Sequence, residues 1–423
     1  MAIYFLNRFF YPDEAATSQY LSDLAFHLAG RGCDVHVVTG NRSYLKGEIL
    51  GPATESVRGV QVHRLDVPAV SNSLLSRALF YPRFLFSAYR YLDNCLEPGD
   101  LLVAMTDPPM SVVPCARLAR RHKAILLTWM HDLFPEIARA LHVPLVRGRS
   151  YRVLQAIRDR ALMQADRHVA ISAAMAERLV SLGIPGQRIM LIRNWADGDA
   201  LRPIPPDKPD LRREWGLENK VVFAYSGNLG RGHDWETLLD AAIRLRDQQT
   251  IRIVVIGHGS GFERLAQAIS AQRLENVLMQ PFQPRERLPD TLAVADVHLV
   301  SLQPPLEGLM SPSKLAGALA VGRPVIYLGD PQAEAAHLLA GHACGKTIAP
   351  GEGRALAETL KEWAGNADNR HAMGERARAL FEAEFDQTAW LARWAELLSA
   401  MESEYRWQAS YLVPRKRTFF SVS

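Results

Sequence analysis

Short apolar runs alternate with longer amphipathic runs along most of the chain, and this alternation constrains the fold more than any other feature. Apolar runs of about six residues suit strands buried on both faces, and the amphipathic runs between them suit helices. In the first half, the predicted strands cover residues 2–7, 34–40, 100–105, 124–130, 168–172 and 188–194. Predicted helices cover residues 18–31, 111–122 and 151–164. Strands separated by helices predict a parallel, doubly wound α/β sheet.

The proline-rich stretch 196–210 divides the chain, because its prolines exclude both a helix and a central strand. The alternation then restarts, with strands predicted over 221–227, 251–257, 276–281, 297–302, 324–329 and 346–350. A chain of 423 residues suits two cores of roughly 200 residues each. We therefore predict two Rossmann-like domains, 1–200 and 207–386, that face one another across a ligand-binding cleft. A final helix over 387–405 is predicted to pack back on the first domain.

Composition excludes several classes of protein. A formal charge of +4 is too small to indicate a nucleic-acid partner, and 48% hydrophobic residues describe an ordinary globular chain. The four cysteines are scattered, which favours a reducing compartment and argues against a zinc site. We read no signal peptide and no apolar run of the roughly 18 residues that cross a membrane. These features predict a cytoplasmic protein, free or peripheral at the inner face of the cell membrane.

Two stretches make an anionic membrane surface a predicted partner. Residues 117–160 contain ten Lys and Arg against three acidic residues, an excess of seven positive charges. In the helix predicted over 74–92, one arc is apolar, with Phe84, Leu85, Ala88, Tyr89 and Leu92, and the other carries Arg83 and Arg90. Such a helix either lies in the membrane interface or packs on the sheet, and the pattern allows both.

A glycine-rich loop follows the first strand of the second half, in SGNLGRGHDWETLLDAA (226–242). Gly227, Gly230 and Gly232 allow the backbone to approach a ligand, Arg231 projects beside them, and Asp234 can cap the next helix. A strand, a glycine loop with an arginine and a helix together predict a diphosphate site. The G-x-x-G-x-G spacing does not match the G-x-G-x-x-G of dinucleotide sites.

The next glycine loop, in IGHGSGFERL (256–265), is closer to a dinucleotide pattern, with Gly257, Gly259 and Gly261. A dinucleotide site also needs an acid at the tip of the following strand, to bind the ribose. That strand ends in Gln280 and Pro281. The sequence therefore disfavours a nicotinamide dinucleotide.

A third candidate site is the turn SPSK (311–314), which precedes a helix of small apolar residues. Ser311 is a suitable N-cap, and Pro312 loses nothing by lacking an N–H there. The first turn would then direct free N–H groups, Ser311, Ser313 and Lys314 toward an anion, most often a phosphate. An ordinary capped crossover between helix and strand is the alternative.

Taken in order, these motifs resemble a family 4 glycosyltransferase with the GT-B fold. The resemblance rests on FLNRFFYPDEAATSQYLSDLAFHLAGRGCDVHVVTG, SGNLGRGHDWETLLDA, IGHGSG and SPSKLAGALAVGRPVI, and it covers about residues 3 to 400. RNWAD (193–197) and the strand HVAIS also match. The branch that it resembles builds bacterial surface polysaccharides and includes aminosugar transferases of O-antigen and capsule pathways.

The resemblance implies transfer of a sugar, with retention, from a nucleotide-sugar donor, most simply a UDP-sugar, to a lipid-linked or saccharide acceptor. Arg231 would bind the donor diphosphate, and His131 and Asp132 would face the donor sugar and acceptor. The glycine loops would contact the donor through Gly227, Asn228, Gly230, Gly257 and Gly259. The DGD at 197–199 lies in the linker, so we expect no metal and no other cofactor. His131 can also be read as a hydrogen-bonded core residue.

The chain departs from the family at one point. Most members carry two glutamates eight positions apart, and these positions fall here on Leu309 and Gly317. Glu307 is two residues out of register and is predicted to substitute for the first, while Gly317 lies at the nucleotide position and Lys314 offers a phosphate contact. The missing pair leaves two alternatives open: a non-catalytic GT-B scaffold, or a nucleotide-sugar epimerase of the same fold.

Overall fold

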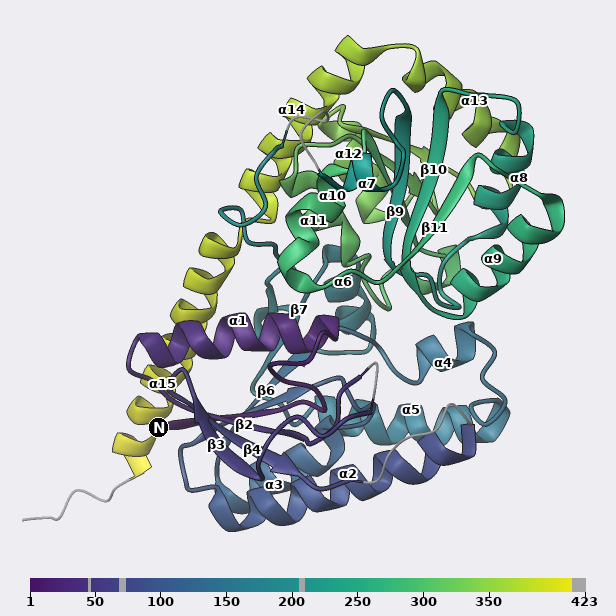
Figure 1. The fold of residues 1–423 in the computed structure, drawn as a ribbon. Helices are drawn as coiled ribbons and strands as arrows, with labels where there is room; N and C mark the ends of the chain where they lie inside the picture. The colour runs from purple at the N-terminus through teal and green to yellow at the C-terminus, as the bar shows by residue number, and fades with distance from the viewer. Residues whose placement is uncertain (45–46, 68–73, 205–209, 413–423) are drawn as a thin grey trace, which may run out of the picture. The chain divides into compact units, whose positions relative to one another are not determined.

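The computed structural model describes residues 1–44, 47–67, 74–204 and 210–412 (Figure 1). The linker prolines within 205–209, and with them the predicted domain start at 207, lie outside the described residues. By its internal contacts, the chain forms two compact units. The first comprises Met1–Trp129, Ala161–Arg167 and Leu391–Ser423, and the second Met130–Arg160 and His168–Trp390.

The first unit contains a sheet with the strand order β3-β4-β2-β1-β5-β6. Strands β1 (Ala2–Leu6), β2 (Asp34–Gly40), β4 (Val60–Leu65), β5 (Leu101–Met105) and β6 (Ile125–Met130) run parallel. β5 and β6 are buried along their whole length, as the apolar runs predict. The pattern did not predict β4 or its antiparallel edge neighbour β3 (Thr54–Val57), because β3 is short and largely exposed.

The helices of the first unit settle one open interpretation. α1 (Ala16–Gly30), α2 (Leu74–Cys95) and α3 (Val112–His122) connect the strands. On α2, Phe84, Ala88 and Leu92 have no exposed surface, so the apolar arc packs in the core. Of the two alternatives that the sequence left open for this helix, packing in the core is therefore the one that holds for these residues. The same unit includes most of α15 (Gln387–Leu412), whose Trp394 ring lies edge-on to Trp129 at 4.7 Å between centroids.

The second unit is built on a six-stranded parallel sheet of order β11-β10-β9-β12-β13-β14. Alternate residues of β9 (Val221–Asn228) face opposite sides: Phe223 and Tyr225 belong to one apolar cluster, and Val222 and Ala224 to another. The other strands are β10 (Ile251–His258), β11 (Val277–Pro281), β12 (Val297–Ser301), β13 (Val325–Leu328) and β14 (Gly345–Ile348). Both faces of this sheet are therefore buried, as a doubly wound sheet requires.

Helices cover both faces of this sheet (Figure 1). One face packs against α8 (Glu236–Arg244), α9 (Ser260–Gln272) and α13 (Gly353–Ala364). The other packs against α7 (Asp210–Glu214), α10 (Leu288–Ala293), α11 (Lys314–Ala320), α12 (Glu334–Gly341) and α14 (Ala367–Glu384). The unit also contains α4 (Glu136–Ala140), α5 (Gly148–Leu162), α6 (Ala173–Ser181) and β8 (Ile189–Leu191), which pairs in parallel with β7 (Arg167–Ala170). The predicted α/β class is confirmed.

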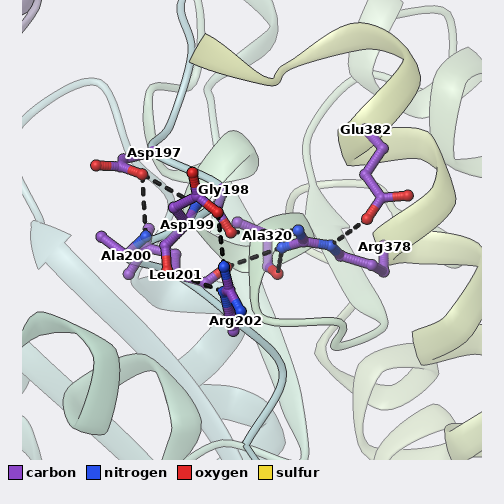
Figure 2. Close-up of polar contacts among 9 residues, drawn as sticks. All are labelled: Asp197, Gly198, Asp199, Ala200, Leu201, Arg202, Ala320, Arg378 and Glu382. Carbon is purple, nitrogen blue, oxygen red and sulfur yellow. Dashed lines mark hydrogen bonds and ion pairs between the residues drawn. The ribbon is translucent and has the colours of Figure 1, made fainter. Parts of the chain in front are cut away.

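Figure 2 shows how the linker is attached to the second unit. The Asp197 carboxylate accepts hydrogen bonds from the backbone N–H groups of Asp199 and Ala200, at 3.0 and 2.9 Å. Arg378 on α14 donates to the carbonyl oxygens of Gly198 and Leu201, and to that of Ala320 at the end of α11. The DGD stretch therefore forms a turn that Arg378 ties to α11. In the described part of the chain, no helix has the length and apolar character to cross a membrane.

Candidate active site

The first glycine loop connects β9 to α8, and its first glycine makes room for a lysine from another element. Gly227 has φ +127°, and a Cβ there would lie 2.7 Å from Cε of Lys314. The lysine stem therefore lies across Gly227, and a side chain at this position would strain the backbone and displace the end of Lys314. At the far end of the loop, Asp234 accepts a hydrogen bond from the Thr237 N–H at 3.0 Å, so its carboxylate satisfies one N–H of the first turn of α8, although Trp235 holds the N-cap position.

The second glycine loop packs directly on the first. A Cβ on Gly257 would lie 2.1 Å from the Gly227 carbonyl oxygen, and one on Gly259 would lie 2.3 Å from Asn228 Oδ1. The Leu229 N–H also donates to the His258 carbonyl at 2.8 Å. Close packing of the two loops thus requires these glycines, and a donor contact for Gly257, Gly259, Asn228 or Gly230 remains a prediction.

The turn before α11 differs from the prediction. Ser313, not Ser311, precedes the helix; its φ and ψ of −56° and −20° are already helical, and its side chain caps nothing. The first turn is instead closed by a backbone hydrogen bond that spans three residues, from the Leu315 N–H to the Pro312 carbonyl, at 3.1 Å. The prediction that Ser311 is the N-cap is therefore wrong, and the seven-residue helix begins at Lys314.

Lys314 lies in a basic and aromatic environment. Its Nζ is 3.4 Å from His233 Nε2 and 5.2 Å from the centroid of the Tyr225 ring. Burial lowers the pKa of Lys314 to about 8, and burial together with Lys314 lowers the pKa of His233 to about 3. Among the described residues, no carboxylate forms an ion pair with Lys314. A desolvated ammonium without a counter-ion is costly, so this position favours the binding of an anion.

Arg231 is exposed, and its guanidinium donates to the carbonyl of Leu141, the residue that follows α4. Within the second unit, this bond joins the first glycine loop to the segment that follows His131 and Asp132. A guanidinium has five N–H donors, so Arg231 retains donors for an anion while it makes this bond. No such contact could be read from the sequence, because 90 residues separate the two partners.

His131 and Asp132 follow β6 directly, as predicted. His131 is 5% exposed, and burial lowers its pKa to about 3, so the ring is neutral near pH 7. Just beyond them, the Leu133 N–H donates to the Leu309 carbonyl at 2.8 Å. The structure thus brings the His131 segment against the loop that carries Glu307. A role for His131 and Asp132 in catalysis remains a prediction.

The positions of the missing glutamates are occupied in different ways. Leu309 is buried, at 4% exposure, and a Cβ on Gly317 would lie 3.4 Å from Leu292 Cδ1. Glu307 Oε1 accepts a hydrogen bond from the Glu334 N–H at 3.1 Å, at the start of α12, and burial raises the pKa of Glu307. Glu307 therefore contributes to the N-terminus of α12, and its predicted sugar contact would be a second role.

A pocket adjoins this region, with about 490 Å³ of empty space that is partly open to solvent. Glu307, Ser311 and Ser313 line it together with Arg193 and Asn194. Arg193 forms ion pairs with Glu334 and Glu384, whereas Asn194 Oδ1 is buried without a hydrogen-bond partner among the described residues. The RNWAD match pointed to this segment, but the sequence assigned no role to either residue.

Two largely parallel α/β sheets, with paired glycine loops and a lysine that forms no ion pair with a carboxylate among the described residues, are the features of a GT-B protein. The structure is similar to the crystal structure of Alr3699/HepE from Anabaena in complex with UDP-glucose. The TM-score is 0.70 over 95% of this chain and 100% of that chain, at 19% sequence identity. At this level of identity the similarity shows the fold alone.

Sequence comparison identifies the family. A glycosyl transferase 4-like domain matches residues 16–195, and the glycosyl transferases group 1 domain matches residues 207–380. WbjE of Pseudomonas aeruginosa, assigned as a glycosyltransferase, is 30% identical over 69% of this chain and 72% of its own length. WcaI of Escherichia coli (strain K12), assigned to colanic acid biosynthesis, is 26% identical over 77% of this chain and 83% of its own. This chain belongs to the group 1 glycosyltransferases and is a glycosyltransferase enzyme.

Proposed function

We propose that this enzyme transfers a sugar from a UDP-sugar to a saccharide or lipid-linked acceptor during the synthesis of a surface polysaccharide. The observation that carries the donor assignment is Lys314, a desolvated cation with no carboxylate partner among the described residues. The complex of HepE with UDP-glucose, in the same fold, supports uridine as the nucleoside. The assignment of WcaI to colanic acid biosynthesis supports the pathway class.

The main chemical task is to stabilise the departing nucleoside diphosphate while the anomeric carbon becomes oxocarbenium-like. Negative charge then develops on the phosphate oxygens, and fixed cations aimed at them lower the barrier. Arg231 and Lys314 supply these cations in our proposal. His131, buried and neutral, would contact the sugar as a hydrogen-bonding group rather than as a charged acid. Retention of the anomeric configuration follows from family membership and belongs to the proposal.

We also propose that transfer needs no resident metal ion, because Arg231 and Lys314 already provide positive charge for the diphosphate. The only D-x-D stretch of the sequence, DGD at 197–199, has its first carboxylate engaged in the linker turn. Adding EDTA should leave turnover unchanged. Loss of activity that Mg²⁺ or Mn²⁺ restores would contradict this part of the proposal.

The donor proposal is tested by incubating the protein with a panel of UDP-sugars and analysing the products. Slow release of UDP and free sugar, abolished in Lys314→Met, is the expected result. Conversion of one UDP-sugar into another would favour the epimerase. Tight binding without any turnover would favour the scaffold, which the absence of both family glutamates at Leu309 and Gly317 makes worth testing.

A lipid-linked acceptor would require contact with a membrane, and α5 offers a suitable surface. One arc of this helix exposes Arg149, Arg152 and Arg160 beside Val153 and Ile157, which are 57% and 44% exposed. Exposed apolar side chains among arginines are typical of helices that lie on anionic membranes. We therefore propose α5, instead of the buried arc of α2, as the membrane-contacting element.

Not every basic residue of the 117–160 stretch contributes to this surface. Arg158 is 2% exposed and forms ion pairs with Glu136 and Asp159, so it belongs to the interior. Each exposed arginine of the stretch that lies near an anionic surface should contribute about 1 kcal/mol to the free energy of membrane binding.

Cosedimentation with vesicles tests the membrane contact. The wild type should bind phosphatidylglycerol vesicles at low salt, and reversing Arg149, Arg152 and Arg160 to Glu should weaken binding at least about 100-fold. The control reverses three exposed arginines elsewhere, Arg246, Arg264 and Arg273, with the same change in net charge. Equal loss in both variants would show a net-charge effect and not a surface at α5.

A further inference from the structure

We propose that His233 donates a hydrogen bond to the donor diphosphate as a neutral imidazole, and that at alkaline pH Lys314 takes up a proton when the diphosphate binds. This inference rests on the proposed function and adds a residue to which the sequence analysis gave no role. His233 lies in the first glycine loop, between Gly232 and Asp234.

The hydrogen bonds of the His233 ring determine which nitrogen carries its proton. The Gly230 N–H donates to His233 Nδ1 at 3.2 Å, so Nδ1 must present a lone pair. A neutral imidazole has one acceptor nitrogen and one N–H. Because burial and Lys314 hold the pKa of His233 near 3, the ring is neutral at physiological pH. The proton is therefore on Nε2, the nitrogen that faces Lys314.

This tautomer conflicts with a charged lysine. His233 Nε2 is 3.4 Å from Lys314 Nζ, and an ammonium group, like Nε2–H, can only donate. Two donors that face each other gain nothing unless an acceptor lies close enough to accept from both. A phosphate oxygen is such an acceptor. In the absence of an anion, the pair is satisfied only when Lys314 loses its proton and accepts from Nε2–H.

The groups around Lys314 also disfavour its charge when no anion is bound. Its stem lies across Gly227 on β9, the Tyr225 ring lies 5.2 Å from Nζ, and His258 at the end of β10 interacts electrostatically with it. The Tyr225 hydroxyl is occupied, since it donates to the Asn228 carbonyl at 2.9 Å. Among the described residues, each of these elements around Lys314 thus contributes a neutral or basic group, and the negative charge must come from the ligand.

The pH dependence follows from these protonation states. With a pKa of about 8, Lys314 is charged below pH 8 before UDP arrives, so UDP affinity is fully present there. Bound diphosphate raises the pKa of Lys314, so the affinity for UDP should fall as the pH rises above 8. The affinity should level off once the pH exceeds the pKa of Lys314 in the complex. At pH 8.5, each binding event should take up roughly three-quarters of a proton from the buffer.

Calorimetric titration with UDP at pH 8.5, in buffers with different enthalpies of ionisation, measures this uptake directly. We expect about 0.75 proton per UDP for the wild type and close to zero for Lys314→Met. Above pH 8 the second ionisation of a phosphate, near pH 6, is complete and does not contribute. No uptake by the wild type, or unchanged uptake by the methionine variant, would overturn the role of Lys314.

Three substitutions separate the two nitrogens of His233. Glutamine can place an N–H near the Nε2 position, asparagine keeps a polar atom near Nδ1 alone, and leucine keeps neither. If Nε2–H contacts the diphosphate, His233→Gln should bind UDP within about threefold of the wild type. His233→Asn and His233→Leu should both bind about tenfold or more weakly. Normal affinity in the asparagine variant would show that His233 only supports the loop through Gly230.

The outcomes also distinguish this inference from the proposed function. A wild type that does not bind UDP contradicts both. A wild type that binds UDP, with affinity and proton uptake unaffected by the His233 and Lys314 substitutions, contradicts only the proposed pair. Thermal unfolding of each variant, without ligand, ensures that a loss of affinity is not a loss of fold.

Discussion

Replacing Gly227 with alanine tests the placement of Lys314 without touching a charged group. The new Cβ would lie 2.7 Å from Lys314 Cε, where carbon atoms normally stay about 3.5–4.0 Å apart. The lysine end is flexible and should move by about 1 Å or more, which displaces Nζ from the anion position. Because a hydrogen bond to a charged group contributes about 1.5–3 kcal/mol, its loss should make UDP bind about 10- to 100-fold more weakly.

The substitution also strains the backbone, so it needs a control with the same strain. Alanine at φ +127° should lower the free energy of unfolding by about 1–3 kcal/mol. Gly351 has φ +89° and nothing within 4 Å of the position of its Cβ. Gly351→Ala should therefore lose similar stability while its UDP affinity stays that of the wild type.

A double-mutant cycle decides whether the loss acts through the lysine. In Lys314→Met, which already lacks the charge, Gly227→Ala should weaken UDP binding little further, so the two effects should not add. Isothermal titration calorimetry gives the four affinities, and denaturant unfolding gives the stabilities. Additive losses, or normal affinity in Gly227→Ala, would refute the placement of Lys314 over Gly227.

Three further predictions concern other residues of the second unit. Arg231→Ala should lower kcat about 100-fold in the UDP-sugar assay, because its charge acts on the leaving diphosphate. Arg264→Ala is the control, and equal kcat values for the two variants would show that Arg231 does not contact the diphosphate. His131→Ala should lower kcat while UDP affinity changes less than about twofold, and an equal loss of affinity would place His131 at the nucleotide. Arg378→Met should lower the free energy of unfolding by about 2–4 kcal/mol, because it leaves the carbonyls of Gly198, Leu201 and Ala320 without their charged donor; a loss below about 1 kcal/mol in urea unfolding would contradict this.

The strands of both sheets could be predicted because a strand buried on two faces must be apolar throughout. The pattern missed β3 and β4, where one face is open and the run is short. It also located the glycine loops, since few residues other than glycine tolerate such close backbone packing. The pattern misplaced the start of α11, because several residues in Ser-Pro-Ser-Lys can precede a helix. Which of them does so depends on the backbone hydrogen bonds, which only the structure shows.

Periodicity indicates which side of a helix is apolar but not what covers it. The apolar arc of α2 meets a sheet, while apolar residues of α5 remain exposed, and the two sequences look equally amphipathic. Glu307 shows the same limit: a carboxylate near the family position is engaged with the N-terminus of α12.

The sequence by itself determined the fold class, the family and the loops from which the site is built, because each depends on short-range pattern or on motif order. Only the tertiary structure placed Lys314 across Gly227 and against His233, 81 residues away. That contact depends on how α11 packs on β12 and β13, which follow β9 in the sheet, and packing is decided by side chains distant in the chain. The neutral state of His233, and the pH-dependent proton uptake that we predict for Lys314, both follow from that packing.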